Sequence, residues 1–272
     1  MKWPGGKFRL LDAILPELPS EGRLVEPFVG SGAVFMNAAN PDCLLCDINP
    51  DLIGFFQALA ADGDAFIREC REFFVPEANR SDEYYRRRDE LNALPPGQAR
   101  AALFLYCNRH GYNGLSRYNA RGEFNVPFGR YSRPYFPEAE MRAFLEKKAS
   151  TRLEFRVADF RQTFSLVREG DVVYCDPPYI PLSPTANFTG YAGNSFGRVE
   201  QEGLAQCIER AAERARRIVV SNHDTPEARE LYRRASGMRR ISVRRSISCK
   251  GARRGTVAEL LAVYKRLDGL DA

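Results

Sequence analysis

The sequence of 272 residues predicts an α/β protein built on a mostly parallel sheet. Apolar, β-prone runs recur at 23–29, 43–48, 153–160 and 171–179, and most of them end on an acidic residue or lead into a glycine turn. Helical patterns separate several of these runs, as is typical of parallel α/β sheets. Between residues 60 and 146 this alternation stops, so we expect an inserted domain there.

The composition limits the class of protein. The formal net charge is +5, which allows a polyanionic partner without requiring one. The seven cysteines are spread through apolar segments, and no charged-then-apolar leader opens the chain, so we expect a reduced, cytoplasmic protein. No apolar run approaches a transmembrane span. Cys43 and Cys46 form a C-x-x-C without a second pair or a nearby histidine, so we expect no metal there.

The N-terminal stretch 2–7 combines Trp3, a pair of glycines and two lysines ahead of a helical pattern that begins near Leu10. Glycines allow close approach of the backbone to a ligand, and a loop that leads into a helix N-terminus is suited to binding. A mobile tail is an equally weighted alternative.

The first strand runs into Gly30-Ser31-Gly32 and then into an expected helix. This is half of a dinucleotide fingerprint, because the third glycine is missing. The second strand ends at Asp47, where a carboxylate is placed to accept hydrogen bonds from ribose hydroxyls. No Gly-rich Lys-Ser/Thr loop for phosphate is present, so we expect an adenosyl ligand without phosphate rather than ATP.

The inserted segment contains helical patterns at 82–92 and 98–107, followed by an irregular stretch at 108–131. Asn-Gly at 113 and Arg-Gly at 121 are turn signals between β-prone pieces, so we expect a β-hairpin. Interleaved arginine, asparagine and tyrosine is typical of a surface that reads and stacks bases. A purely structural, arginine-rich hairpin is the alternative.

Two stretches are rich in arginine. Residues 100–133 hold six arginines against the single acid Glu123, and a second basic run extends over 233–254. Both suggest contacts with phosphates, although a solvated surface explains the second run equally well.

The third strand ends in Asp159-Phe160, which could contact an adenine ring. The strand at 171–175 leads into Asp176-Pro177-Pro178-Tyr179. The prolines stiffen the loop, Asp176 and the Pro177 carbonyl can accept hydrogen bonds from an amino group, and Tyr179 offers a face for stacking. Together they form a clamp for an exocyclic amine on an aromatic base. A strand-end turn with a capping aspartate is the alternative.

The remaining chain completes the α/β pattern. A polar loop at 183–195 is too long for a simple connection and is expected to be functional. Two helices and a strand follow, and two closing strands at 238–247 and 257–264 flank a basic turn at 249–255. This pair suggests an antiparallel edge on the sheet.

In this order, Lys-Trp-Pro-Gly-Gly-Lys, Glu-Pro-Phe-Val-Gly-Ser-Gly, Asp-Ile-Asn, Tyr-Asn-Gly-Leu-Ser-Arg-Tyr-Asn and Asp-Pro-Pro-Tyr resemble the motifs of the Dam family of DNA adenine-N6 methyltransferases. The resemblance runs nearly end to end and is most specific in the hairpin. It implies a Rossmann-like methyltransferase domain at 1–59 and 147–272, with a mainly helical target-recognition domain at 60–146 that bears the hairpin. It also implies S-adenosyl-L-methionine as donor, double-stranded DNA as partner and GATC as target.

The expected site residues follow from these motifs. The catalytic residues are Asp176, Pro177, Pro178 and Tyr179. The donor-binding residues are Trp3, Lys7, Glu26, Phe28, Gly30, Gly32, Phe35, Asp47, Ile48, Asp159, Phe160 and Asp176. The DNA-binding residues are Lys2, Tyr112, Asn113, Leu115, Arg117, Asn119, Pro127 and Tyr131. Lys2 matches a lysine that reads the outer base pair; Pro4 departs from the family, which often has alanine there.

We expect the target adenine to be flipped out of the duplex, because its amino group is inaccessible inside it. Neither His110 nor His223 is required, and we expect a monomer in solution. Two alternatives remain open: an amino-methyltransferase that acts on RNA or on a protein amide, and a catalytically silent DNA-binding homologue. The intact residues Asp176 to Tyr179, with Gly30, Gly32 and Asp47, argue against the second.

Overall fold

The computed structural model describes residues 1–180, 196–244 and 256–266. Its strands are β1 (Leu24–Glu26), β2 (Asp42–Asp47), β3 (Arg152–Val157), β4 (Val172–Cys175), β5 (Arg217–His223), β6 (Gly237–Arg244) and β7 (Thr256–Lys265). They form one sheet in the order β3-β2-β1-β4-β5-β7-β6. The first five strands pair in parallel, and β7 lies antiparallel between β5 and β6. The predicted Rossmann-like α/β fold with an antiparallel edge is therefore confirmed.

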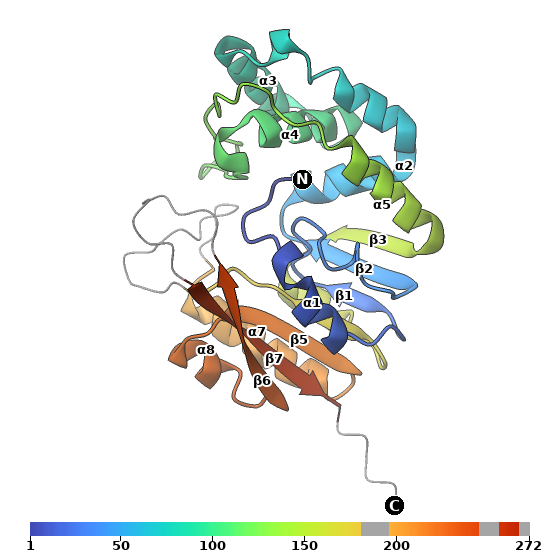
Figure 1. Ribbon diagram of the computed structural model, residues 1–272, viewed down its shortest axis with the longest axis vertical. Coiled ribbons are helices and arrows are strands. Elements are labelled where there is room, and N and C mark those ends of the chain that lie inside the picture. The colour runs from blue at the N-terminus through green and yellow to red at the C-terminus, as the bar shows by residue number, and fades with distance from the viewer. Residues whose placement is uncertain (181–195, 245–255, 267–272) are drawn as a thin grey trace, which may run out of the picture.

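Helices pack on the sheet as shown in Figure 1. The α-helices are α1 (Leu11–Ile14), α2 (Pro50–Arg71), α3 (Ser81–Ala93), α4 (Gln98–His110), α5 (Glu138–Ser150), α6 (Phe160–Ser165), α7 (Arg198–Ala212) and α8 (Pro226–Leu231). Short 3-10 helices are η1 (Phe8–Leu10), η2 (Leu15–Glu17), η3 (Pro76–Ala78) and η4 (Tyr112–Gly114). None of the described helices has the length and apolar character needed to cross a bilayer.

The two faces of the sheet belong to two hydrophobic clusters. One contains buried residues of α1, α2, α4 and α5, and the other contains buried residues of α6, α7 and α8. Alternate residues of β2 point to opposite faces, so Cys43 lies in the first cluster and Cys46 in the second. The two thiols of the C-x-x-C therefore cannot ligate one ion together.

The helices α2 to α5 come between β2 and β3 in the sequence, and they lie in the upper part of Figure 1. Helix α2 starts at the Asn49 cap, continues past residue 60, where the inserted domain was expected to begin, and bends at Gly63, whose φ is +49°. The expected domain boundary thus falls inside a helix. Phe66 of α2, Phe104 of α4 and Phe155 of β3 all belong to the first cluster, so the inserted helices and the sheet share one core.

The helix expected after Gly32 does not form as a regular element, and the residues that follow it make turns instead. The Asn37 side chain donates to the Ala33 carbonyl at 2.8 Å, and Pro41 restricts the chain just before β2. The polar loop at 183–195 and the basic turn at 249–255 lie outside the described residues.

The expected β-hairpin is reduced to two isolated antiparallel bridges, Gly111 with Phe128 and Tyr118 with Phe124. Side chains of α3 take up the backbone groups that a ladder would use. Tyr84 donates its hydroxyl to the Val126 carbonyl at 3.0 Å, and Asn92 bonds both the N–H and the carbonyl of Phe124. Backbone hydrogen bonds also cross the stretch, such as that from the Asn125 N–H to the Arg117 carbonyl at 3.0 Å. The stretch 111–131, hereafter the recognition segment, is thus shaped by short backbone pairing together with side chains of α3.

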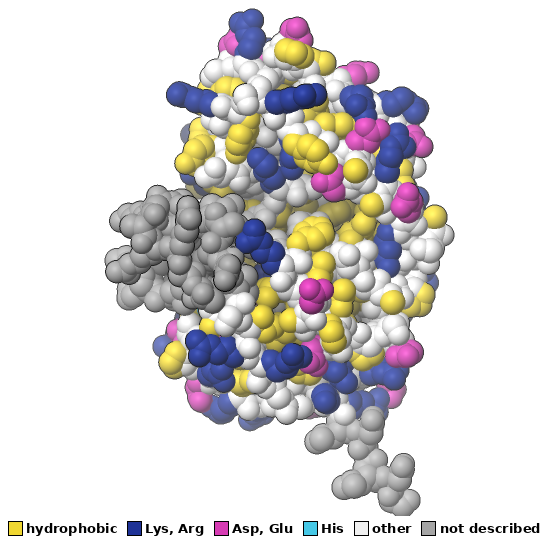
Figure 2. All heavy atoms as spheres, in the orientation of Figure 1, with side chains coloured by type: hydrophobic (Ala, Val, Ile, Leu, Met, Phe, Trp, Pro, Cys, Tyr) yellow, Lys and Arg dark blue, Asp and Glu magenta, His cyan; other side chains and the backbone are white. Residues whose placement is uncertain are grey.

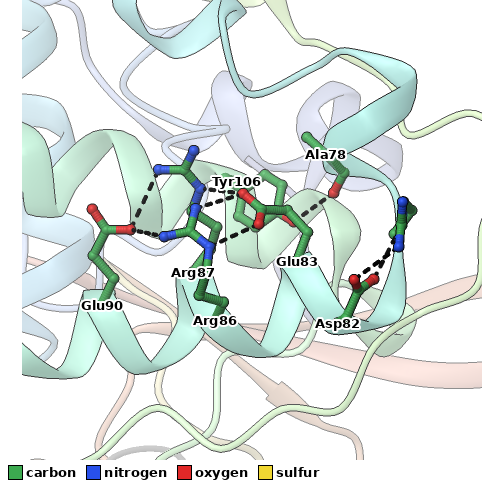
Figure 3. A network of polar contacts seen from close by, with 8 residues as sticks. Ala78, Asp82, Glu83, Arg86, Arg87, Glu90 and Tyr106 are labelled. Carbon is green, nitrogen blue, oxygen red and sulfur yellow. Dashed lines mark hydrogen bonds and ion pairs between the residues drawn. The ribbon is translucent and has the colours of Figure 1, made fainter.

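Many basic side chains are paired with acids. On α3, Glu83 and Glu90 hold Arg86 and Arg87 in one network, and these guanidinium groups lower the pKa of Glu83 to about 2 (Figure 3). In the second basic run, ion pairs join Arg233 to Glu230, Arg234 to Glu209, Arg239 to Glu17 and Arg240 to Asp224. Figure 2 accordingly shows basic side chains interspersed with acidic ones over the upper helices. Charge count alone therefore does not locate a phosphate-binding surface.

Asp171 offers a test of what holds the centre of the sheet together. Arg23, just before β1, donates two hydrogen bonds to Asp171, which precedes β4, at 2.7 and 3.2 Å; Asp171 is buried and the Arg23 side chain is 12% exposed. Asp171→Ala would remove the carboxylate partner of a mostly buried guanidinium, which would keep only its hydrogen bond to the Leu166 carbonyl, so we expect it to lower the free energy of unfolding by roughly 3 kcal/mol. Urea denaturation measures this change. Asp82→Ala, which breaks an exposed pair with Arg80, is the control and should change stability little; equal losses would contradict the assignment.

Candidate functional site

The ends of the parallel strands bring three acids to one edge of the sheet. Strand β1 pairs with both β2 and β4, and their last residues lead to Glu26, Asp47 and Asp176. The chain leaves β1 toward β2 and leaves β4 toward β5, on the other side of β1. Open α/β sheets bind ligands at such a switch in strand order, beyond the carboxyl ends of the strands. This strand-end region is called the crevice below. The three acids were all expected at the site, and the structure brings them together.

Lys7 is the cation of this crevice. Its Nζ lies 2.8 Å from Asp176 Oδ2, donates to the Gly5 carbonyl at 2.7 Å and stands 4.6 Å from the centre of the Tyr179 ring. Burial raises the pKa of Asp176, and the charge of Lys7 opposes that rise. The second oxygen, Oδ1, is buried with no hydrogen-bond partner in the described structure. A buried acceptor left open is costly, so this atom is a candidate acceptor for a ligand N–H.

Tyr179 is held by residues from the far side of the sheet. Its hydroxyl donates to Glu259 of β7 at 2.7 Å, and the His223 ring packs against its edge. Burial raises the pKa of the phenol well above its ordinary value, so Tyr179 is neutral. Glu259 and His223 were not predicted to serve this site. No sequence signal marks Glu259, because it becomes a neighbour of Tyr179 only through the antiparallel pairing of β7.

Two hydrogen bonds with other elements fix the chain at Pro178 and Ile180. Gln201 of α7 donates to the Pro178 carbonyl at 2.7 Å, and the Ile180 N–H donates to Asn222 of β5 at 3.2 Å. The loop after β4 is therefore stiffened by its prolines and by two side-chain hydrogen bonds. Such a loop holds Asp176 and Tyr179 in one geometry.

Asp47 is buried at the end of β2 and accepts from two backbone groups. The Gly30 N–H bonds Oδ2 at 3.2 Å, and the Asn49 N–H bonds Oδ1 at 3.0 Å. Burial nevertheless raises its pKa to about 6. Glu26 has a pKa raised well above its ordinary value by burial, so it is neutral. Burial therefore raises the pKa of all three acids, and Glu26 is the one that stays protonated.

The glycine turn permits close packing. Gly30 has φ of +49°, and a Cβ there would lie 3.0 Å from Nε1 of Trp3. Trp3 therefore packs directly on the turn. Gly32 has φ of +79°, and a Cβ there would lie 2.4 Å from the Phe35 ring. A side chain at either position would displace an aromatic ring in addition to straining the backbone.

The remaining residues expected to bind the donor differ in their access. The Phe28 and Phe160 rings stack with centres 6.0 Å apart, and Asp159 caps the N-terminus of α6. Ile48 is 47% exposed beside Asp47 and can cover a flat apolar ligand. Phe35 is fully buried, so its side chain belongs to the core and only its backbone N–H, which bonds Glu26, faces the site.

The residues expected to bind DNA cluster around the N-terminal stretch. Asn108 bonds both the N–H and the carbonyl of Lys2, and Lys2 Nζ stands 4.1 Å from the centre of the Tyr131 ring. Gly114 has φ of +61°, and a Cβ there would lie 2.4 Å from Cβ of Lys2. The residues near the start of the chain thus lie against the recognition segment.

Arg117 is exposed on the recognition segment, and its guanidinium is braced from one side. Its Nε and Nη2 donate to the side-chain and backbone oxygens of Asn125 at 2.8 and 3.1 Å. Tyr112 is half exposed, Asn113 and Pro127 are exposed, and Leu115 is partly buried. Asn119 instead bonds the backbone N–H groups of residues 121 and 123, which closes the turn.

Three other polar residues of the inserted region are structural in their contacts. Arg100 bonds Asp51 and two carbonyls of the α3 end, and Arg109 is buried and donates to the Tyr135 carbonyl. His110 is buried against Tyr106, and burial lowers its pKa to about 4. These two arginines, which were counted in the first basic stretch, therefore do not face solvent as phosphate contacts would.

Comparison with known proteins shows the family to which this chain belongs. D12 class N6 adenine-specific DNA methyltransferases match residues 3–247. The DNA adenine methylase of Escherichia coli K12 is 49% identical over 265 residues, which cover 97% of this chain and 94% of that protein. The DNA adenine methylase of Vibrio cholerae is 48% identical over 97% of this chain and 95% of its own length, and that of Haemophilus influenzae is 46% identical over 97% and 92%.

The raised pKa of Asp47 predicts a pH dependence of stability. Between its ordinary value of 3.8 and about 6, the folded chain binds more protons at this group than the unfolded chain, so the free energy of unfolding falls as the pH rises through this window. Asp47→Asn lacks this component. From about pH 4 to about pH 7, we expect wild type to lose on the order of 3 kcal/mol relative to the variant. Urea denaturation of both proteins across this range tests it, and a constant difference would contradict a desolvated carboxylate.

Proposed function

Because the chain belongs to the D12 class of N6 adenine-specific DNA methyltransferases, we propose that it transfers a methyl group from S-adenosylmethionine to N6 of an adenine flipped out of duplex DNA, with GATC as the target. One observation carries the catalytic part of the proposal. Asp176 presents a buried, unpartnered oxygen beside the ring of Tyr179 at the crevice between β1 and β4.

The residues of the crevice fit the donor. Asp47, already aligned by two backbone N–H groups, has remaining lone pairs for the ribose hydroxyls. Gly30 allows close approach of the backbone, and Ile48 with the Phe28 and Phe160 pair offers apolar surface near the end of β2. The crevice has no Lys-Ser/Thr phosphate loop in its sequence, which suits a donor without phosphate.

The same residues account for the chemistry. The amino nitrogen of adenine is a poor nucleophile, because its lone pair is delocalised into the ring. Asp176 Oδ1 and the Pro177 carbonyl would accept its two hydrogens and favour a more tetrahedral nitrogen, while Tyr179 stacks on the ring. S-adenosylmethionine supplies, when bound, a sulfonium methyl group for in-line displacement. The protein contributes orientation, and Asp176 stabilises the positive charge that develops at N6.

Lys7 is the ionic partner of Asp176. It pairs with Asp176 Oδ2, while Oδ1 stays available as an acceptor. The charge of Lys7 thereby favours the ionised carboxylate, which is the form that accepts hydrogen bonds from the amine. Glu259 would keep the Tyr179 ring in place through its hydroxyl. Neither histidine is given a chemical role, since His110 is buried in the inserted helices, and His223 packs against the Tyr179 ring and contacts the Ile180 carbonyl at 2.8 Å.

Target recognition is proposed for the recognition segment and Lys2. Arg117 is the candidate for a guanine, because arginine can donate two parallel hydrogen bonds to O6 and N7. Asn125 already holds its Nε edge, so its outer edge stays directed away from the segment. The firm backbone bonds between Lys2 and Asn108 support a role for Lys2 at the outer base pair.

Membership of the family favours an active DNA methyltransferase over the two alternatives. An enzyme for RNA or a protein amide would share the clamp, so methyl transfer to DNA, RNA and protein should be compared directly. A catalytically silent homologue would bind DNA without transfer. Digestion of DNA from cells that express this chain with enzymes sensitive to adenine methylation at GATC tests activity and target together.

Asp176→Ala should abolish methyl transfer, because it removes the acceptor for the amine, and the fold should survive since the acid lies at a strand end. Turnover at saturating donor and DNA measures this, with circular dichroism as the check on folding. Asp64→Ala, which removes an exposed acid paired with Arg142, is the control and should retain turnover within about tenfold. More than a tenth of wild-type turnover in Asp176→Ala would contradict its role.

Arg117→Ala should relax the choice of sequence. Losing a bidentate contact should cost about 1–3 kcal/mol of discrimination at one base position. The measurement compares turnover on GATC and on sites with each single base changed, at fixed salt. A phosphate contact would behave differently, since it weakens all sequences alike. Equal loss on every site, with relative preferences intact, would show that Arg117 positions the backbone.

A further inference from the structure

A chain of buried hydrogen bonds joins the donor side of the crevice to the recognition segment. It starts at Asp47, whose Oδ1 accepts the Asn49 N–H at 3.0 Å. From there the Asn49 side chain reaches the recognition segment: its amide nitrogen donates to Ser116 Oγ at 3.3 Å, and its oxygen accepts the Tyr118 hydroxyl at 3.3 Å. Asn49 and Ser116 are at most 5% exposed.

The chain has a second anchor in the inserted helices. The single hydrogen of the Tyr118 hydroxyl is shared between Asn49 and Asp51 Oδ2, which lies closer, at 2.7 Å. Arg100 of α4 holds Asp51 with two hydrogen bonds. Asn49 at the same time caps α2 by accepting from the N–H groups of Asp51 and Leu52. Asn49, Asp51 and Ser116 are buried, and Tyr118 and Arg100 are partly buried, so a shift at one end of this set of hydrogen bonds leaves a polar group unsatisfied at the other.

Arg117 stands between the two residues that this chain anchors. Ser116 and Tyr118 are held toward the donor side, while the guanidinium of Arg117 points outward and is braced by Asn125. The position of the Arg117 backbone therefore depends on Asn49. Asn49 in turn depends on Asp47, because a ribose bound to Asp47 would favour the ionised carboxylate and strengthen the charge-assisted hydrogen bond from the Asn49 N–H.

We propose that Asn49, Ser116 and Tyr118 couple the donor site to the recognition segment, so that donor binding sharpens the choice of target sequence and target DNA tightens donor binding. This inference rests on the proposed function, since it takes Asp47 as the donor residue and Arg117 as the base reader. The three residues act as positioning residues and touch neither the reacting nitrogen nor the methyl group. Coupling between two binding sites must be reciprocal, which gives the proposal two independent readouts.

The test uses variants that remove single hydroxyls from the chain. Ser116→Ala and Tyr118→Phe each delete one contact with the Asn49 side chain and leave its cap on α2 intact. Tyr135→Phe is the matched control, because its hydroxyl bonds only the exposed Glu140 among the described contacts. Thermal melting confirms that each protein is folded before binding is measured.

Calorimetry gives the dissociation constant of S-adenosylhomocysteine, an unreactive probe, for each protein alone, with a GATC duplex and with a duplex that has one base pair changed. In wild type and in Tyr135→Phe, the GATC duplex should tighten the probe by roughly fivefold or more, and the changed duplex should do so less. In Ser116→Ala and Tyr118→Phe, the ratio of the probe's dissociation constant without duplex to that with duplex should approach one for both duplexes. The probe alone should bind to each variant within about threefold of wild type.

The reciprocal measurement is the preference for GATC over the changed duplex, with and without the probe. Wild type should show a higher preference with the probe, and the two variants should show the same preference in both conditions. Variants that keep the full wild-type ratios would overturn the proposal. A wild type that methylates GATC yet shows a ratio of one would overturn the coupling alone, whereas a wild type with no preference among duplexes would overturn the proposed target itself.

Discussion

The parallel pairing of β1 with both β2 and β4 is the constraint on which the site depends. It forces the carboxyl ends of the three strands to one edge and thereby collects Glu26, Asp47 and Asp176 in a partly buried space. Three negative charges there would repel one another strongly. The protein resolves this in three ways: Glu26 is kept neutral, backbone N–H groups bond Asp47, and Lys7 pairs with Asp176. The N-terminal loop is thus part of the charge balance of the strand ends.

Much of the fold could be predicted because its signals are local. Apolar runs that end on acids indicate strand ends, and the antiparallel closing pair follows from two β-prone runs near the chain end. The extent of α2 could not be predicted, because its continuation past residue 60 depends on packing against α4 and α5 in a shared core. The hairpin was over-predicted for a related reason. Turn signals showed where the chain reverses, whereas several backbone partners came from α3, far away in the sequence, so that only short pieces pair with each other.

The candidate site divides in the same way. Asp47, Asp176 and the glycine turn lie where strand order places ligands, so their grouping could be inferred from the sequence. Glu259 could not, because a glutamate in an edge strand has no distinguishing pattern, and it meets Tyr179 only through sheet pairing. Arg100 and Arg109 show the opposite failure. Both lie in an arginine-rich stretch that suggested contacts with phosphates. In the structure, however, Arg100 bonds Asp51 and Arg109 bonds the Tyr135 carbonyl, so both side chains are used within the inserted region.

The dependence of the recognition segment on α3 limits how the specificity proposed for it could be re-engineered. Tyr84 and Asn92 supply the partners of the Val126 and Phe124 backbone, so the loop carries only part of the information for its own shape. A segment transplanted onto another scaffold would lose that support and its exposed side chains would no longer converge. Libraries that vary only outward-facing positions, with α3 left unchanged, preserve the platform on which new base contacts can be selected.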